Sequence, residues 1–163
     1  MQATSAFELN DIRGMRVQGT VLALALRPQK GGAMVLTDSI SITPEDGVIG
    51  DHGSSSRRQV TLLDDRAWEM ACSDLGVTLD WTIRRSNILV SELDLQQLAS
   101  HQIRIGNTLI EVIGEVVPCH VMDAAHHGLK EALETDWRGG VYGRILSSGQ
   151  IKVGDTITIY SSQ

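Results

Sequence analysis

"QIRIGNTLI", residues 102–110, returns in altered form as "QIKVGDTIT", residues 150–158. Each version predicts a short strand, a turn at Gly-Asn or Gly-Asp, and a second strand. Two copies of one turn unit do not make a repeat protein, which needs whole repeated supersecondary units. They indicate instead a closed barrel in which the chain uses the same strand–turn–strand unit twice to enter the barrel wall.

Short strand-like runs separated by glycine, serine, proline and aspartate occupy much of the remaining chain. We expect strands within residues 16–28, through Leu63 and over residues 87–90. A loop over residues 50–56 is too polar for the core, and we expect it to border a site. Helical patterns run from Asp64 or Asp65 to near Gly76 and from about Asp94, and residues 120–134 form one helix or two helices broken near Gly128. The sequence therefore predicts a mostly β fold, a closed twisted β-barrel with two or three short helices.

The composition is that of a globular protein with an acidic balance. The 163 residues fit one domain over residues 1–163, with 42% apolar and 21% charged residues. The net charge of −6 argues against sequence-independent binding to nucleic acid or an anionic membrane. No run approaches the about 20 apolar residues of a membrane helix. The start "MQATSAFELNDIRG" lacks a secretory signal pattern, so we expect a cytoplasmic protein. From the acidic charge we expect its partner to be a small molecule or another protein.

The two cysteines, Cys72 and Cys119, have different contexts. A reducing compartment favours two free thiols over a disulfide. Cys72 flanks the apolar face of a predicted helix, which indicates a packing role. Cys119 follows Pro118 at a predicted strand end and precedes a segment that could open a helix, where unpaired N–H groups favour a thiolate. Position alone leaves Cys119 open between a small buried residue and a reactive sulfur.

Two arginine pairs, Arg57 with Arg58 and Arg84 with Arg85, each precede a predicted strand. Guanidinium groups match the geometry of phosphate, so the pairs could form an anion pocket at the strand entrances. Salt bridges to the many surface acids are the commoner role, and the residues alone favour that interpretation. The histidines near Cys119 lack zinc-site spacing, so we do not expect a classical zinc site.

Six motifs in order resemble those of the MOSC family, named after the C-terminal domain of molybdenum cofactor sulfurase. They are "GVIGD" (47–51), "RRQVTLLD" (57–64), "RRSNILV" (84–90), "IRIGNTLIEV" (103–112), "PCHVMD" (118–123) and "GGVYGRILSSGQIKVGD" (139–155). The resemblance covers residues 20–160 approximately. Family members often have Gly-Asp-Arg-His where this chain has Gly-Asp-His-Gly at residues 50–53, which weakens the basic character of that position.

The resemblance implies a twisted barrel similar to that of pyruvate kinase and a functional cysteine, here Cys119. In members that bind molybdenum cofactor (molybdopterin), this cysteine supplies a thiolate to the metal. The two arginine-containing motifs help to hold the pterin and its phosphate. The cofactor contacts carried over to this chain are Arg58, Thr61, Arg85, Asn87 and Pro118. With the resemblance included, an anion pocket becomes the favoured role of the arginines.

Three hypotheses about function follow. The chain could bind molybdenum cofactor and reduce N-hydroxylated compounds, with electrons from a separate electron-transfer protein because it has no iron–sulfur or flavin segment. It could instead carry sulfur on Cys119, received from a pyridoxal phosphate-dependent cysteine desulfurase, for metal–sulfur cofactor assembly. A non-catalytic barrel that binds an anionic small molecule or a protein partner is the third. The family's reductases carry an additional N-terminal β domain, for which we expect no room in this chain.

Overall fold

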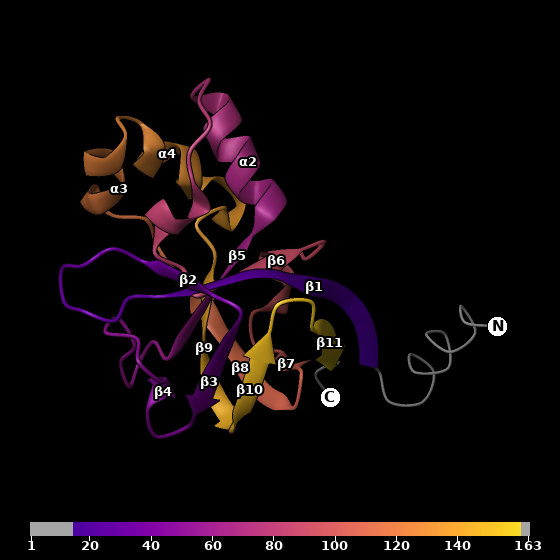
Figure 1. Ribbon diagram of the computed structural model, residues 1–163. Coiled ribbons are helices and arrows are strands. Elements are labelled where there is room, and N and C mark those ends of the chain that lie inside the picture. Colours follow the sequence, from indigo (N-terminus) through magenta and orange to yellow (C-terminus); the bar gives the residue numbers. More distant parts are fainter. Residues whose placement is uncertain (1–14, 161–163) are drawn as a thin grey trace.

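A computed structural model describes residues 15–160 of the chain (Figure 1). Its strands are β1 (Met15–Leu26), β2 (Val35–Thr37), β3 (Ser39–Thr43), β4 (Gly47–Val48), β5 (Val60–Asp64), β6 (Ile88–Ser91), β7 (Gln102–Ile105), β8 (Thr108–Glu115), β9 (Val141–Ser147), β10 (Gly149–Lys152) and β11 (Thr156–Tyr160). Apolar side chains alternate along most of them, as expected for strands with one face in the core.

Seven of these strands close into a ring in the order β1, β11, β7, β8, β9, β5, β6. The ring closes because β1 pairs antiparallel with β11 on one edge and with β6 on the other. Strand β2 pairs antiparallel with the last residues of β1 and is not part of the ring. Strands β10, β3 and β4 form a separate three-stranded sheet. The predicted mostly β fold with a closed barrel is confirmed.

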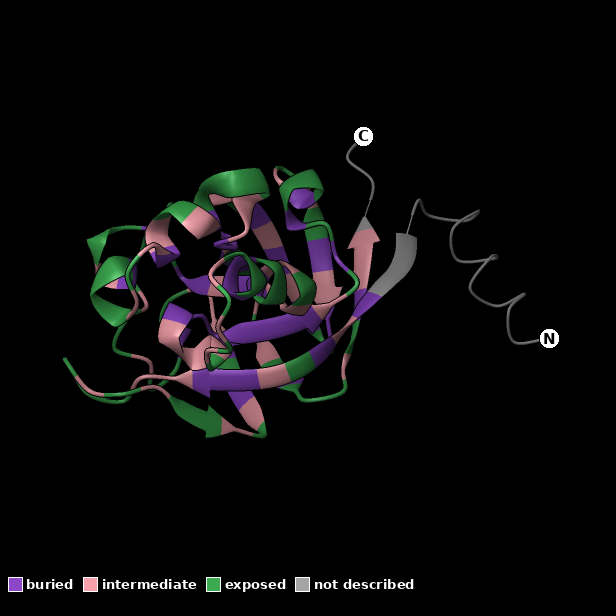
Figure 2. Ribbon diagram, turned by 90° about the horizontal axis from the view of Figure 1, so that it is seen from above, coloured by how far each residue is buried: buried purple, intermediate pink, exposed green. Residues whose placement is uncertain are grey.

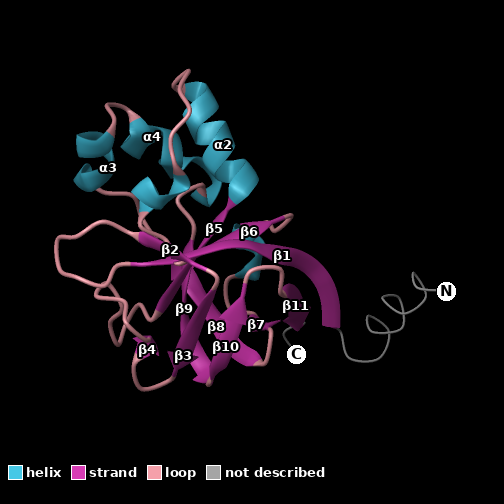
Figure 3. Cartoon of the chain, in the orientation of Figure 1, coloured by secondary structure: helices cyan, strands magenta, loops and turns pink. Residues whose placement is uncertain are grey.

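The three α-helices, α2 (Asp65–Asp74), α3 (His120–Ala125) and α4 (Leu129–Glu134), lie together on one side of the barrel (Figure 3). The 3-10 helices are η1 (Trp81–Arg84), η2 (Leu95–Leu98) and η3 (Thr135–Trp137), and Leu95 and Leu98 of η2 pack in the barrel core. Asp64 caps α2 by accepting a hydrogen bond from the amide of Ala67. Gly128, with φ of 89°, separates α3 from α4, so the segment that the sequence left open between one helix and two forms two. The segment after Asp94 is a 3-10 turn.

Two apolar cores result from alternation along β5 and β6. Leu62 and Ile88 point into the barrel, whereas Leu63 and Leu89 point outward and pack under the helices. The helical layer adds Cys72 from α2 and other apolar side chains from α3 and α4. Buried residues therefore follow both the strands and the inner faces of the helices (Figure 2). Both faces of β5 and β6 are covered, which explains their continuous apolar runs.

Strands β5 and β6 are parallel neighbours, with Leu62 opposite Ile88. A parallel pair needs a crossover connection, and here α2 and η1 provide it. Because the strands run in one direction, their beginnings lie at the same edge of the barrel. Both arginine pairs precede these strands, so the topology brings residues 57–58 and 84–85 to one place.

Two sequence expectations need correction. The nine-residue pattern forms the hairpin β7–β8 in its first copy, but in the second copy β10 pairs with β3 while β11 pairs with β7 and β1. The barrel is therefore not entered in the same way twice, because the second turn passes between two sheets. Strand β8 ends at Glu115, so Pro118 does not itself end the strand.

No helix among residues 15–160 has both the length and the apolar character needed to cross a membrane.

Candidate anion and thiol site

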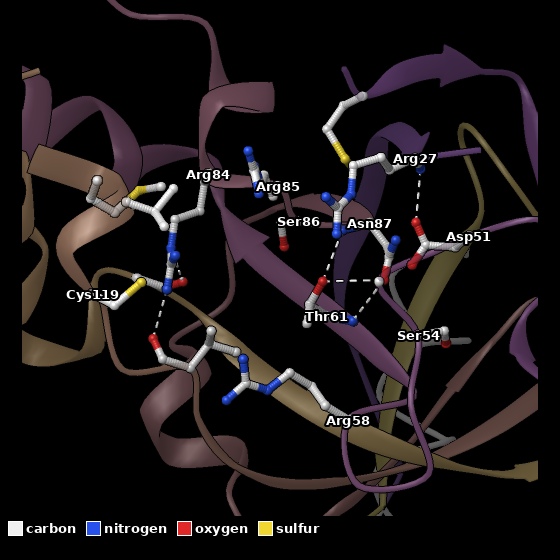
Figure 4. A pocket seen from close by; sticks show the side chains of 16 residues that line it. Arg27, Asp51, Ser54, Arg58, Thr61, Arg84, Arg85, Ser86, Asn87 and Cys119 are labelled. Carbon is white, nitrogen blue, oxygen red and sulfur yellow. Dashed lines mark hydrogen bonds between the residues drawn. The ribbon is translucent and has the colours of Figure 1, made fainter. Parts of the chain in front are cut away.

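A pocket of about 210 Å³ opens where the beginnings of β5 and β6 meet the segment between β8 and α3. Cys119 lines it, together with the guanidinium-bearing side chains of Arg27, Arg58, Arg84 and Arg85. Figure 4 shows Cys119 beside Arg84, with Arg27 and Thr61 farther along the pocket. The sequence motifs that lie far apart in the chain thus share one cavity.

None of the four pocket arginines forms a salt bridge with a carboxylate of residues 15–160. Surface salt bridging is therefore not what holds them here. Arg58 lies over the ring of Tyr142, with 5.4 Å from its guanidinium carbon to the ring centroid. A cation held by an aromatic face keeps its N–H groups free for an anion. In a chain of net charge −6, this cavity concentrates positive charge.

Arg84 is buried, with 8% of its surface exposed. Its Nε donates to the carbonyl of Gly139 at 2.9 Å, and its Nη2 donates to the carbonyl of Val116 at 2.7 Å. Burial lowers the pKa of Arg84, and the charges that Cys119 and Glu115 carry when ionised act in the opposite direction. Arg84 is therefore a buried cation with hydrogen-bond partners but without a salt bridge to any carboxylate of the part of the chain that the structure describes.

Cys119 occupies the N-cap position of α3 and is exposed to solvent. Its side chain makes no capping hydrogen bond to the helix. The amide of Met122 is instead bonded to the backbone carbonyl of Cys119, so the sulfur is not held by the first turn. The interpretation of Cys119 as a small buried residue does not describe this structure. Cys72, in contrast, is buried in α2 and has the packing role that the sequence indicated.

Thr61 and Asn87 are joined across the parallel strand pair. The backbone and side chain of Thr61 both donate to Asn87 Oδ1 at 3.1 Å, and the amide of Asn87 donates to Thr61 Oγ1 at 3.0 Å. The side-chain amide of Asn87 also donates to the carbonyl of Ala25 at 3.2 Å. These bonds occupy most of the polar capacity of both side chains. Their main effect is to fix the pocket wall.

The loop that the sequence placed beside a site does border the pocket, through Asp51, Gly53 and Ser54. Asp51 accepts a hydrogen bond from the backbone amide of Arg27 at 2.8 Å, and the amide of His52 donates to the carbonyl of Arg27. A Cβ atom at Gly53 would lie 3.4 Å from Arg27 Nη2. Arg27 therefore supplies a cation beside the position where the family pattern has a basic side chain and this chain has glycine.

The MOSC domain model matches residues 49–158, most of the chain. The chain belongs to the MOSC family. This family is associated with molybdenum cofactor and with sulfur-related functions. No curated protein matches the sequence.

Three solved structures share the fold. YuaD from Bacillus subtilis matches with a TM-score of 0.74 and 18% identity, over 90% of this chain and 97% of that chain. YiiM from Geobacillus stearothermophilus matches with a TM-score of 0.67 and 13% identity, over 88% and 75%. YiiM from Escherichia coli matches with a TM-score of 0.64 and 14% identity, over 90% and 70%. At these identities the likeness shows the MOSC fold alone.

Five of the six nominated residues line the pocket, namely Arg58, Thr61, Arg85, Asn87 and Cys119. The sixth, Pro118, is buried beside Cys119 and is not part of the lining. Arg57 is not part of this lining and borders an adjoining hollow with Tyr142, a hollow that shares Arg58 and Gly53 with the pocket.

Sequence reasoning missed two of the pocket cations as individual candidates. Arg27 stands alone at the end of β1, where no local pattern marks it. Arg84 was considered only as half of a pair, and its burial depends on carbonyl groups 32 and 55 residues away in the sequence.

Proposed function

We propose that this MOSC protein binds molybdenum cofactor in the arginine pocket, with Cys119 as the protein's sulfur ligand. One observation carries the proposal: an exposed cysteine shares a cavity with four guanidinium groups that have no carboxylate partner among the described residues. A pterin phosphate needs such cations, and a soft metal ion prefers a thiolate.

The donor set fits this group. Residues 15–160 contain no cluster of three or more His, Cys, Asp or Glu side chains that could hold a metal ion alone. A metal at Cys119 would therefore take its other ligands from the cofactor. The phosphate would have Arg27, Arg58 and Arg85 within the same cavity.

The residues around these contacts have supporting roles in the proposal. Thr61 and Asn87 hold the wall of the pocket through their cross-strand bonds and retain limited capacity to bond the pterin. Pro118 packs beside Cys119 and restricts the backbone from which the sulfur projects. When bound, the cofactor supplies redox chemistry that suits reduction of N-hydroxylated compounds. The electrons would come from a separate protein.

The test is metal and pterin analysis of protein purified from a host that makes the cofactor. We expect molybdenum and pterin in equal amounts, and loss of the metal in Cys119→Ser. Arg85→Gln should weaken pterin retention, whereas Arg57→Gln, a loss of equal charge outside the pocket, should not. Absence of molybdenum and pterin from the unaltered protein rejects the proposal.

Sulfur carriage is the second candidate, favoured by the exposure of Cys119 and by the lack of a capping bond to its side chain. A carrier thiol must reach both a donor and an acceptor, and an exposed thiol can do so. A cysteine desulfurase is the natural donor for this role. A persulfide on Cys119 in protein without molybdenum, after incubation with desulfurase and cysteine, supports this function over the first.

A further inference from the structure

The end of the pocket around Cys119 holds more positive charge than either candidate function requires. Arg84 is more than nine-tenths buried, lines the pocket next to Cys119 and forms no salt bridge with a carboxylate of residues 15–160, although Glu115 is near enough to raise its pKa. Arg58 is near enough to Arg84 to lower the pKa of that guanidinium. Arg58, which precedes β5, and Arg84, from η1, line the same cavity as Cys119. Such a site can accept a small dianion in contact with the sulfur.

The hydrogen bonds of Arg84 leave donors available. Its bonds to Gly139 and Val116 use Nε and Nη2, and no further bond from its Nη1 to residues 15–160 is present. Guanidinium carries five N–H donors, so several stay open toward a ligand. The two carbonyl groups fix the guanidinium in place, and a preorganised cation loses little freedom when an anion binds.

We propose that this chain also takes sulfur directly from thiosulfate or a related sulfane-sulfur oxyanion, with Cys119 as the acceptor and Arg58 and Arg84 as the anion-binding groups. This inference rests on a reactive Cys119 but not on binding of molybdenum cofactor.

The reaction balances without an added oxidant or reductant. The Cys119 thiolate attacks the outer sulfur of thiosulfate and forms a new S–S bond. The sulfur–sulfur bond of thiosulfate breaks, and its electron pair leaves with sulfite. Cys119 then carries a persulfide anion. A nucleophile such as cyanide can remove the outer sulfur as thiocyanate and regenerate the thiolate.

Charge explains why this step needs the observed arginines. A thiolate and a thiosulfate dianion repel each other, and the net charge of −6 on the chain adds to that repulsion. Guanidinium groups beside the sulfur offset the repulsion and favour the approach of the anion. The exposure of Cys119 allows sulfite to leave and an acceptor to enter.

The test uses the full chain purified from a host that cannot make molybdenum cofactor. After incubation with thiosulfate, we expect sulfite release in an amount equal to the protein and a mass increase of one sulfur atom on the Cys119 peptide. With cyanide present, thiocyanate should accumulate over many turnovers. Cys119→Ser should abolish all three signals, and Cys72→Ser should retain them.

A matched pair of arginine variants tests the anion-binding step. Arg58→Gln should raise the thiosulfate concentration needed for half-maximal rate by roughly 10-fold, the effect of one charge-assisted contact. Arg57→Gln removes the same charge from the adjacent position outside this pocket and should change it less than about 2-fold. The same Arg58 variant should slow alkylation of Cys119 by anionic iodoacetate more than by neutral iodoacetamide, a difference that a purely structural role would not produce.

Two results overturn the inference. One is the absence of sulfite release from the unaltered protein while iodoacetamide still modifies Cys119. The other is equal loss of thiosulfate affinity in Arg57→Gln and Arg58→Gln, which would indicate general charge attraction only. Either result leaves the cofactor proposal standing if molybdenum binds. Conversely, sulfite release from a protein that never binds molybdenum rejects only the cofactor proposal.

Discussion

Cys72 and Cys119 lie in two regions that give the same type of side chain opposite surroundings. Cys72 packs in the helical layer between α2 and the outer face of the barrel, with 4% of its surface exposed. Cys119 stands at the N-cap of α3, exposed, at the edge of a cavity with four arginines. Chemistry therefore depends on the surroundings that the fold provides and not on the thiol alone.

The largest expected difference is in reaction rate. In native protein at neutral pH, we expect iodoacetamide to modify Cys119 about 10³-fold faster than Cys72, because only 4% of the surface of Cys72 is exposed, where it borders a surface hollow. A time course of labelled peptides by mass spectrometry measures both rates together. In denaturant the two rates should converge. Similar rates in the native protein would remove the basis for any special role of Cys119.

A smaller difference is expected in stability. Cys72→Ser places a hydroxyl group in an apolar core, so the free energy of unfolding should fall by about 1–3 kcal/mol. Cys119→Ser should change it by less than about 0.5 kcal/mol, because the side chain is exposed. Urea denaturation of the two variants measures the contrast. An equal loss in both would mean that Cys119 supports the fold.

The smallest expected effect is a loss of stability at η1, the turn that connects the helical layer around Cys72 with the pocket at Cys119. Trp81 and Ile83 pack against the helical core, while Arg84 reaches the pocket. Asp80 caps this turn through bonds from the amide and hydroxyl of Thr82. Asp80→Ala should cost about 1 kcal/mol of unfolding free energy in urea denaturation at neutral pH. No loss at neutral pH would show that the cap does not stabilise the folded chain.

The pH dependence of this loss has a definite sign. The side-chain and backbone hydrogen bonds from Thr82 lower the pKa of Asp80 below its ordinary value of 3.8. A carboxyl group with a lowered pKa in the folded state stabilises the protein above its unfolded pKa. The difference between the unaltered protein and Asp80→Ala should thus be complete near neutral pH and disappear as the pH falls below 3.8. A difference that persists in acid would assign the loss to packing instead.

The barrel could be predicted because its signals are local. Strand alternation, the glycine turns and the cap at Asp64 each depend on a few neighbouring residues. Pairing could not be predicted in the same way. The second nine-residue pattern has the composition of a hairpin, yet β10 finds its partner in β3, more than a hundred residues earlier in the chain.

The residues of the site divide in the same way, into those that local sequence signals predict and those that depend on long-range contacts. Cys119 and Arg85 belong to short motifs, so a family resemblance could nominate them. Arg27 and the burial of Arg84 arise only when remote segments meet, since the cations are placed by the end of β1 and by the carbonyl groups of Val116 and Gly139. No pattern within one segment carries that information.

The pairing of β1 with β11 has a consequence for the making of the protein. Thr20 lies opposite Thr156, so the barrel is closed by its first and last described strands. On the ribosome, β1 must wait until β11 has emerged before it can pair, and closing so long a loop is slow. Until then β1 and β7 each keep an open edge, the part of a nascent chain most prone to aggregation.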